Sequence, residues 1–160
     1  MIEYVKGNIF KSHCFAAVNP VNCVGVMGAG LAKQFKERYP NMFEAYRKYC
    51  SSGKMKLEQN YIWVNPNSLR SDYDCTNYGE FVNIICMPTK YHWKDKSQIE
   101  WVKGALLDLY NYVKVNYDNG CSIAIPKIGC GLGGLNWEND VKPLIEQIFE
   151  NLNITIKVYE

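Results

Sequence analysis

The sequence predicts an α/β fold, a three-layer α/β/α sandwich with a mixed, largely parallel central sheet. Apolar segments of strand length alternate with segments of helical periodicity along the chain, which is typical of such sandwiches. One expected strand, Phe81–Met87, is apolar enough to be central in the sheet. Two glycine-rich segments each follow an expected strand and precede an expected helix. In parallel sheets, ligands bind outside the carboxyl ends of the strands, where both of these segments would lie.

Six segments are expected to form the strands. Proline at position 20 is expected to end the second strand, because proline has no donor for the ladder. The polar, turn-rich segment 66–80 predicts a loop or a hairpin extension. The expected strands are Met1–Phe10, Phe15–Val18, Tyr61–Val64, Phe81–Met87, Cys121–Ile125 and Ile154–Tyr159.

Apolar residues three and four positions apart predict four helices. The pattern from Ser97 to Glu100 is typical of a capping box and is expected to open the longest helix. Asp140 is expected to cap the last helix, which places Pro143 in its first turn. The expected helices are Leu31–Tyr39, Asn41–Cys50, Ile99–Val113 and Val141–Leu152.

Composition is that of one soluble globular domain covering residues 1–160, with 48% apolar and 21% charged residues. The net charge of +2 is too small to predict nucleic-acid binding by itself. Seven cysteines without a C-x-x-C pair favour neither a metal site nor disulfides, and indicate a reducing cytoplasm. The N-terminus carries Glu3 and Lys6, unlike a signal peptide, and no segment reaches the length of a membrane span.

The glycine-rich segments Gly25–Gly30 and Ile125–Trp137 predict a site for a nucleotide diphosphate. Glycine lets the backbone turn its amides toward a ligand, and amides near a helix N-terminus bind phosphate. Neither segment ends in the Gly-Lys-Ser/Thr of a Walker loop. Gly129–Gly134 matches a dinucleotide fingerprint, but only 26 residues follow it, too few for a nicotinamide-binding half. Two tight turns without a ligand are the alternative.

Lys90 directly follows the expected central strand and faces the same rim of the sheet. Partial desolvation lowers the pKa of a lysine and allows it to act as a nucleophile or base. Lys90, Lys94 and Lys96, with Tyr91 and Trp93 between them, could guide a nucleic-acid strand by phosphate contact and stacking. A solvated turn is the alternative for these residues.

Other polar side chains near the glycine segments are weaker candidates. Asn22 could hydrogen-bond a sugar hydroxyl, although Asn19 and Asn22 could instead satisfy turn backbone. Cys130 has no adjacent base in the sequence, so we expect it to pack rather than to react. For His92 we expect a structural or surface role.

Three motifs together resemble the macrodomain family, which binds ADP-ribose. They are Asn19-x-x-Asn22-Cys23-Val24-Gly25-Val26-Met27-Gly28-x-Gly30-x-Ala32, Pro88-Thr89-Lys90-x-His92-Trp93 and Gly129-Cys130-Gly131-Leu132-Gly133-Gly134-Leu135-x-Trp137. The resemblance covers nearly the whole chain and extends to the branch that contains the DarG antitoxin, which removes ADP-ribose from thymidine bases in DNA. That branch is similar to the human terminal ADP-ribose glycohydrolase, which clears ADP-ribose from acidic side chains.

The resemblance implies a role for each matching residue. Asn8 and Ile9 would hold the adenine, Asn22 would position the distal ribose, and Lys90 would be the catalytic lysine near its anomeric carbon. The human enzyme carries a catalytic Asp where this sequence has Gly133, so an Asp-assisted mechanism is not expected. The residues that would wrap the diphosphate and distal ribose are Met27, Gly28, Ala29, Gly30, Leu31, Gly129, Cys130, Gly131, Leu132 and Gly133.

The resemblance therefore implies a single macrodomain that acts as an ADP-ribosyl hydrolase on modified DNA bases, with no metal or cofactor. The expected partners are ADP-ribose or an ADP-ribosylated substrate, including single-stranded DNA, and the expected state is a cytoplasmic monomer. Two alternatives remain, a phosphatase of ADP-ribose 1″-phosphate and a module that reads ADP-ribose without turnover.

Overall fold

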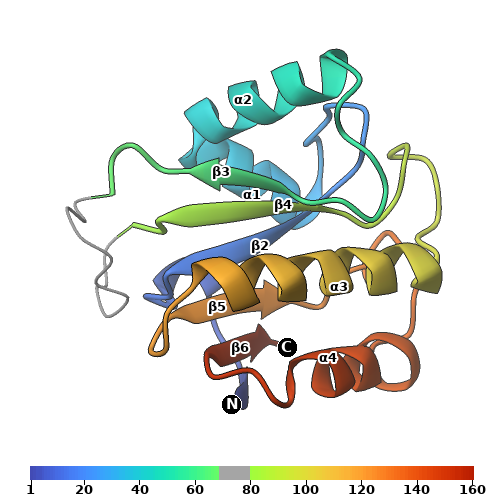
Figure 1. Ribbon diagram of the computed structural model, residues 1–160. Helices are drawn as coiled ribbons and strands as arrows, with labels where there is room; N and C mark the ends of the chain where they lie inside the picture. Colours follow the sequence, from blue (N-terminus) through green and yellow to red (C-terminus); the bar gives the residue numbers. More distant parts are fainter. Residues whose placement is uncertain (69–79) are drawn as a thin grey trace.

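The computed structural model describes residues 1–68 and 80–160, which fold around a six-stranded sheet of order β1-β6-β5-β2-β4-β3 (Figure 1). Neighbouring strands pair in parallel, except β3, which runs antiparallel to β4 at the sheet edge. This confirms the expected mixed, largely parallel sheet. The loop or hairpin expected over 66–80 lies mostly outside the described residues. The strands are β1 Ile2–Val5, β2 Ala16–Val21, β3 Tyr61–Val64, β4 Asn83–Pro88, β5 Ser122–Pro126 and β6 Thr155–Tyr159.

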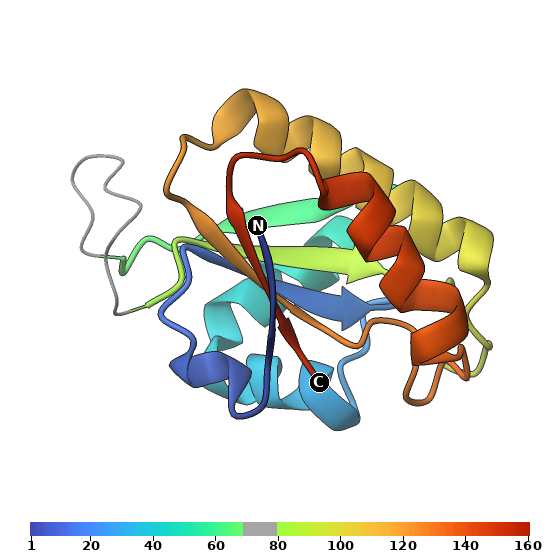
Figure 2. The same cartoon turned by 90° about the horizontal axis from the view of Figure 1, so that it is seen from below.

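Helices cover both faces of the sheet and produce the three expected layers (Figures 1 and 2). Successive residues of β4 point to opposite faces, so Ile84 packs with Phe35 of α1, while Ile85 packs with Leu106 of α3. Helices α1 and α2 cover the first face, and α3 and α4 cover the second. The helical segments are η1 Ile9–Lys11, α1 Gly30–Arg38, α2 Pro40–Ser51, α3 Ile99–Asn116, the π-helical η2 Trp137–Val141 and α4 Lys142–Phe149.

Strand β2 continues through Pro20, so the expected break at this proline is wrong. The carbonyl of Val21 accepts the Thr89 amide at 3.0 Å, so alternate residues of β2 direct their backbone groups toward β4. Pro20 faces the other neighbour, β5, with which pairing ends at Ala17. The missing donor of Pro20 therefore costs no ladder hydrogen bond, and β2 and β5 no longer pair with each other at their carboxyl ends.

The two expected helix caps are also wrong. Gln98, not Ser97, is the N-cap of α3, and the buried Ser97 hydroxyl has no hydrogen-bond partner within the described residues. The Ser97 amide instead donates to the carbonyl of Gly133 at 2.9 Å. Asp140 lies inside η2, where its carboxylate accepts the Asn136 amide at 2.9 Å. Contacts to the second glycine segment therefore override the local capping pattern at Ser97.

Cysteine chemistry differs from the expectation at one position. The free thiols in the described part of the chain are Cys14, Cys23, Cys50, Cys86 and Cys130. Cys121 is disulfide-bonded, so the expectation that the cysteines form no disulfide is wrong for this residue. None of the helices in the described ranges is long and apolar enough to cross a membrane.

Candidate functional site

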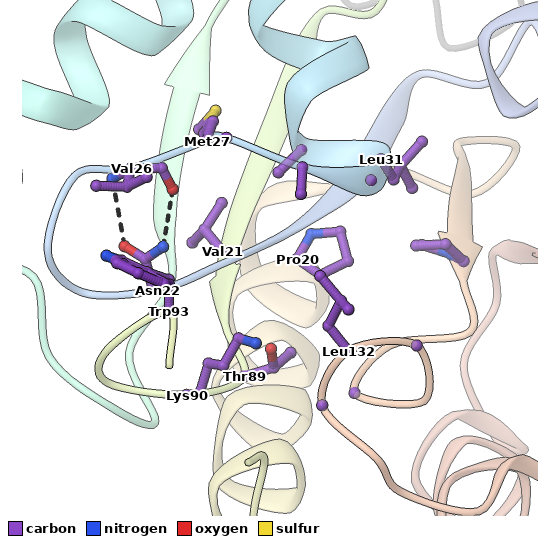
Figure 3. Close-up of a pocket in the computed structure, with 18 of the residues that line it drawn as sticks. Pro20, Val21, Asn22, Val26, Met27, Leu31, Thr89, Lys90, Trp93 and Leu132 are labelled. Carbon is purple, nitrogen blue, oxygen red and sulfur yellow. Dashed lines mark hydrogen bonds between the residues drawn. The ribbon is translucent and has the colours of Figure 1, made fainter. Parts of the chain in front are cut away.

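A cavity of about 620 Å³ opens at the carboxyl ends of β2, β4 and β5 (Figure 3). It lies where β2 and β5 are no longer paired, which is the position expected for a ligand of a parallel sheet. Eleven of the fourteen site residues predicted from the sequence line it. These are Asn22, Met27, Gly28, Ala29, Gly30, Leu31, Lys90, Gly129, Gly131, Leu132 and Gly133.

The first glycine loop ends in an uncapped helix N-terminus at the cavity wall. Ala29 is the N-cap of α1 and contributes no side-chain cap, and the first turn carries no acidic residue. The first backbone bond of the helix runs from the Lys33 amide to the Ala29 carbonyl at 3.3 Å. The amides of residues 30–32 are therefore left without a partner within the helix, at its positive end. This end of α1 can accept an anion.

Asn22 holds the first loop in shape from inside. Its side-chain nitrogen donates to the Val26 carbonyl at 2.8 Å, and its Oδ1 accepts the Val24 amide at 3.0 Å (Figure 3 shows the bonds to Val26). The buried Tyr46 hydroxyl donates to both the carbonyl and Oδ1 of Asn22, at 2.8 and 2.9 Å. Burial raises the pKa of Tyr46, so this hydroxyl remains a donor. Both polar atoms of the Asn22 side chain thus serve the loop.

The second glycine loop folds back on itself beside Ser97. Gly129 takes a φ of +73°, and its carbonyl accepts the Leu135 amide at 2.9 Å. A β-carbon on Gly133 would lie 2.4 Å from the Ser97 hydroxyl oxygen and 2.5 Å from the Gly129 carbonyl oxygen. Within the ranges that the structure covers, the amides of residues 131–133 donate no hydrogen bond. Close packing on one side therefore leaves a row of unpaired donors along the cavity.

Lys90 extends from the carboxyl end of β4 toward Thr89, between Asn22 and Leu132 (Figure 3). Its side chain is half-buried, and among the described residues it forms no ion pair. Burial lowers the pKa of Lys90, the neighbouring Lys96 lowers it further, and Asp95 opposes this effect. A lysine in this environment is easier to deprotonate than a solvated one, as the sequence indicated.

Three predicted residues lie outside the cavity wall. Asn8 is exposed and caps η1 by accepting the Phe10 amide at 2.9 Å, so the expected N-terminal strand ends earlier, at Val5. Ile9 is buried in the core below α1. The Cys130 thiol donates to the Ile128 carbonyl, and burial raises its pKa to about 11, which supports the expected packing role.

Sequence reasoning missed part of the cavity wall. The missed residues sit at or just beyond the carboxyl ends of three strands, where the edge rule for parallel sheets could have found them. They include Pro20, Val21, Thr89, Pro126 and Lys127. Within residues 1–68 and 80–160, no group of three or more His, Cys, Asp or Glu side chains is arranged to hold a metal ion.

Comparison with known proteins connects this geometry to one family. The Macro domain family model matches residues 18–143. A DNA ADP-ribosyl glycohydrolase of Mycobacterium tuberculosis is 38% identical over 152 residues, which is 95% of this chain and 40% of that protein. More distantly, an ADP-ribose 1″-phosphate phosphatase of Candida albicans is 27% identical, over 99% of both chains.

Solved structures agree with this assignment. The macrodomain of Mycobacterium tuberculosis DarG matches with a TM-score of 0.87 and 36% identity, over 99% of this chain and 97% of that chain. Thermosipho africanus DarTG in complex with ADP-ribose matches with a TM-score of 0.85 and 29% identity, over 99% and 41%. The chain spans about 40% of the length of the first curated relatives. Since the family model matches well over half of the sequence, this chain belongs to the macro domain family, as the resemblance of its three motifs implied.

Proposed function

We propose that the cavity binds ADP-ribose and that the chain is an ADP-ribosyl hydrolase acting on modified DNA bases. One observation carries the proposal: the Lys90 amine lies in the wall of the same cavity as both glycine loops. The glycohydrolase names of several curated relatives, and the DarTG structure with ADP-ribose, support the same substrate class.

The two rows of unpaired amides would hold the diphosphate. The N-terminus of α1 offers amides 30–32 from one side, and the second loop offers amides 131–133 from the other. Such donors bind phosphate oxygens without a metal ion, since they are already oriented before the ligand arrives. Lys127 adds a positive charge to the wall. The volume of about 620 Å³ is in the range of pockets for ligands of nucleotide size.

Lys90 would act at the distal ribose. Its lowered pKa makes the neutral amine easier to form than in a solvated lysine. That amine would add to the anomeric carbon as the bond to the modified base breaks, and the proton that the amine loses would pass to the released base. Water then releases the sugar from the lysine. Gly133 leaves no space for an acidic side chain in the second loop, so the chemistry would rest on Lys90. Asn22 would position the ribose through the loop that it holds.

A panel of three substrates tests the proposal with the wild-type chain and Lys90→Ala. The substrates are ADP-ribosylated single-stranded DNA, a peptide ADP-ribosylated on an acidic side chain, and ADP-ribose 1″-phosphate. We expect the wild type to release ADP-ribose from the DNA, and Lys90→Ala to lose that turnover while still binding ADP-ribose in calorimetry. Turnover of the DNA by Lys90→Ala at the wild-type rate would contradict the role of Lys90.

Two other results would replace the proposal. Phosphate release from ADP-ribose 1″-phosphate alone would favour the phosphatase function, for which the Candida albicans relative is the precedent. ADP-ribose binding without turnover of any of the three substrates would indicate a reader.

A further inference from the structure

Exposed apolar side chains gather at the mouth of the cavity. Ten large hydrophobic residues are exposed in the described part of the chain, and five of them lie in the three segments that form this mouth. Val26, Trp93 and Leu132 line the cavity itself, and Val24 and Tyr91 each lie two residues before one of these in the chain. Trp93 both lines the cavity and remains 50% exposed. Concentrated exposure of this kind marks an interaction surface.

The turn that carries Trp93 is held rigid by its own polar groups. The Asp95 carboxylate accepts the His92 amide at 2.9 Å, and the His92 ring nitrogen Nδ1 accepts the Lys94 amide at 3.1 Å. The Tyr91 carbonyl accepts the Cys23 amide at 2.7 Å, which ties the turn to the first glycine loop. His92 therefore has the structural role expected of it. The half-exposed Trp93 ring is presented in one place without being buried, which reduces the entropy lost on binding.

The same turn is positively charged. Residues 90–96 contain three lysines and one aspartate, so the net charge of this turn, +2, equals that of the whole chain. The Lys94 ammonium lies over the Trp93 ring, 5.1 Å from its centre, and the His92 ring packs against Trp93 with the ring centres 5.1 Å apart. The Lys96 side chain runs beside Gly134 of the second loop. A flat aromatic surface thus lies next to several cations at the edge of the cavity.

This combination fits a single-stranded nucleic acid. Stacking on an exposed indole requires a planar ring with a free face, which an unpaired base offers and a base inside a duplex does not. The lysines complement the backbone phosphates on either side of such a base. An acidic peptide would satisfy the charges but would leave the Trp93 ring without a planar partner.

We propose that Trp93 and Lys94 hold the nucleotide next to the one that carries the ADP-ribose. The neighbouring base displaces the exposed Lys94 side chain from the Trp93 ring and stacks there, and Lys94 then contacts a backbone phosphate. This inference rests on the proposed hydrolase function. Trp93 is a positioning residue here, because it orients the strand at the mouth while Lys90 acts deeper in the cavity.

The test compares two substrates that share the same ADP-ribose linkage. One is a single-stranded decamer with one ADP-ribosylated thymine, and the other is the ADP-ribosylated nucleoside alone. In Trp93→Ala, the ratio of kcat/KM for the decamer to that for the nucleoside should fall about tenfold. Trp93→Phe should restore most of this ratio, since it retains an aromatic face. Thermal unfolding verifies that each variant is folded.

Salt dependence tests the phosphate contact. In Lys94→Gln, the slope of log kcat/KM for the decamer against log salt should become shallower by about 0.7. Lys114→Gln is the matched control, since Lys114 also lies over an aromatic ring, Tyr110, near the C-terminal end of α3. The control should keep the wild-type slope.

An unchanged substrate ratio in Trp93→Ala overturns the inference. So does an equal loss on both substrates, because Trp93 would then act on the ADP-ribose itself. If the wild type cleaves neither substrate, the proposed function fails. Fluorescence anisotropy with the unmodified decamer then tests strand binding at this surface independently of turnover. Weaker binding by Trp93→Ala and Lys94→Gln would then uphold the strand contact, and equal binding would overturn it.

Discussion

Replacing Gly133 with alanine should displace the second glycine loop from the cavity. The added β-carbon would lie 2.5 Å from the Gly129 carbonyl oxygen, whereas real β-carbons stay at least 3.0 Å from such atoms, so the backbone must move by about 0.5 Å. Both ends of the close contact are held. The Gly129 carbonyl accepts the Leu135 amide at 2.9 Å, and the Gly133 carbonyl accepts the Ser97 amide at 2.9 Å.

Relief of the clash must therefore strain or break one of these two hydrogen bonds. Forced overpacking costs about 1–3 kcal/mol of the free energy of unfolding. For a chain of this size, each 1 kcal/mol lowers Tm by about 2–4 °C, so Tm should fall by about 2–12 °C. Displacement of amides 131–133 should also raise the Kd for ADP-ribose by roughly tenfold for each phosphate hydrogen bond lost.

Thermal unfolding and calorimetry with ADP-ribose measure the two effects. Gly131→Ala is the control for stability, because a β-carbon there meets no atom within 4 Å, and its Tm should match the wild type. Adding Ser97→Ala to Gly133→Ala removes the contact at 2.4 Å but not the one to the Gly129 carbonyl, so only part of the lost Tm should return. Wild-type Tm and wild-type affinity in Gly133→Ala would refute the packing described for this loop.

Three further predictions concern the other parts of the site. Burial and Lys96 lower the pKa of Lys90, so kcat should rise with pH through that pKa. Lys96→Gln should move this rise to higher pH. A kcat that falls with pH would show that the Lys90 ammonium acts instead. Gly131→Glu should abolish ADP-ribose binding in calorimetry, since a carboxylate would repel the diphosphate while its β-carbon sits in open space, and undiminished affinity would contradict the shared binding site. Tyr46→Phe should cost about 1–3 kcal/mol in urea unfolding, because the Asn22 carbonyl loses the hydroxyl donor that it shares with Oδ1, while Oδ1 keeps the Val24 amide. An unchanged midpoint would show that this hydroxyl is not needed.

The alternation of strand and helix patterns predicted the architecture because it indicates which residues are buried on the two faces of the sheet. Ile84 and Ile85 are both apolar, and the sheet places them in separate cores on opposite faces. A strand buried on both sides must read as a continuous apolar run, and residues 84–88 of β4 do so. The glycine segments predicted an anion-binding site for a similar reason, since glycine lets the backbone turn its amides toward a ligand.

Local patterns misled where a distant segment competes for the same group. Ser97 matches a capping box, yet its amide is taken by Gly133, and the cap falls to Gln98. Pro20 suggested the end of a strand, yet pairing on its side has already stopped at Ala17. In both cases the outcome depends on a partner far along the chain, which a window of a few residues does not contain.

By itself, the sequence determined the fold class, the two amide-presenting loops and Lys90 as the candidate for chemistry, because burial periodicity and residue type are local properties. Only the tertiary structure decided that the loops face one cavity with Lys90 between them, that Tyr46 supports Asn22 from α2, and that Gly133 has no room for a side chain. These are distances between groups separated along the chain, and they follow from strand order and register, which place the carboxyl ends of β2, β4 and β5 together. The two glycine segments form a site because β2 and β5 stop pairing with each other beyond Ala17.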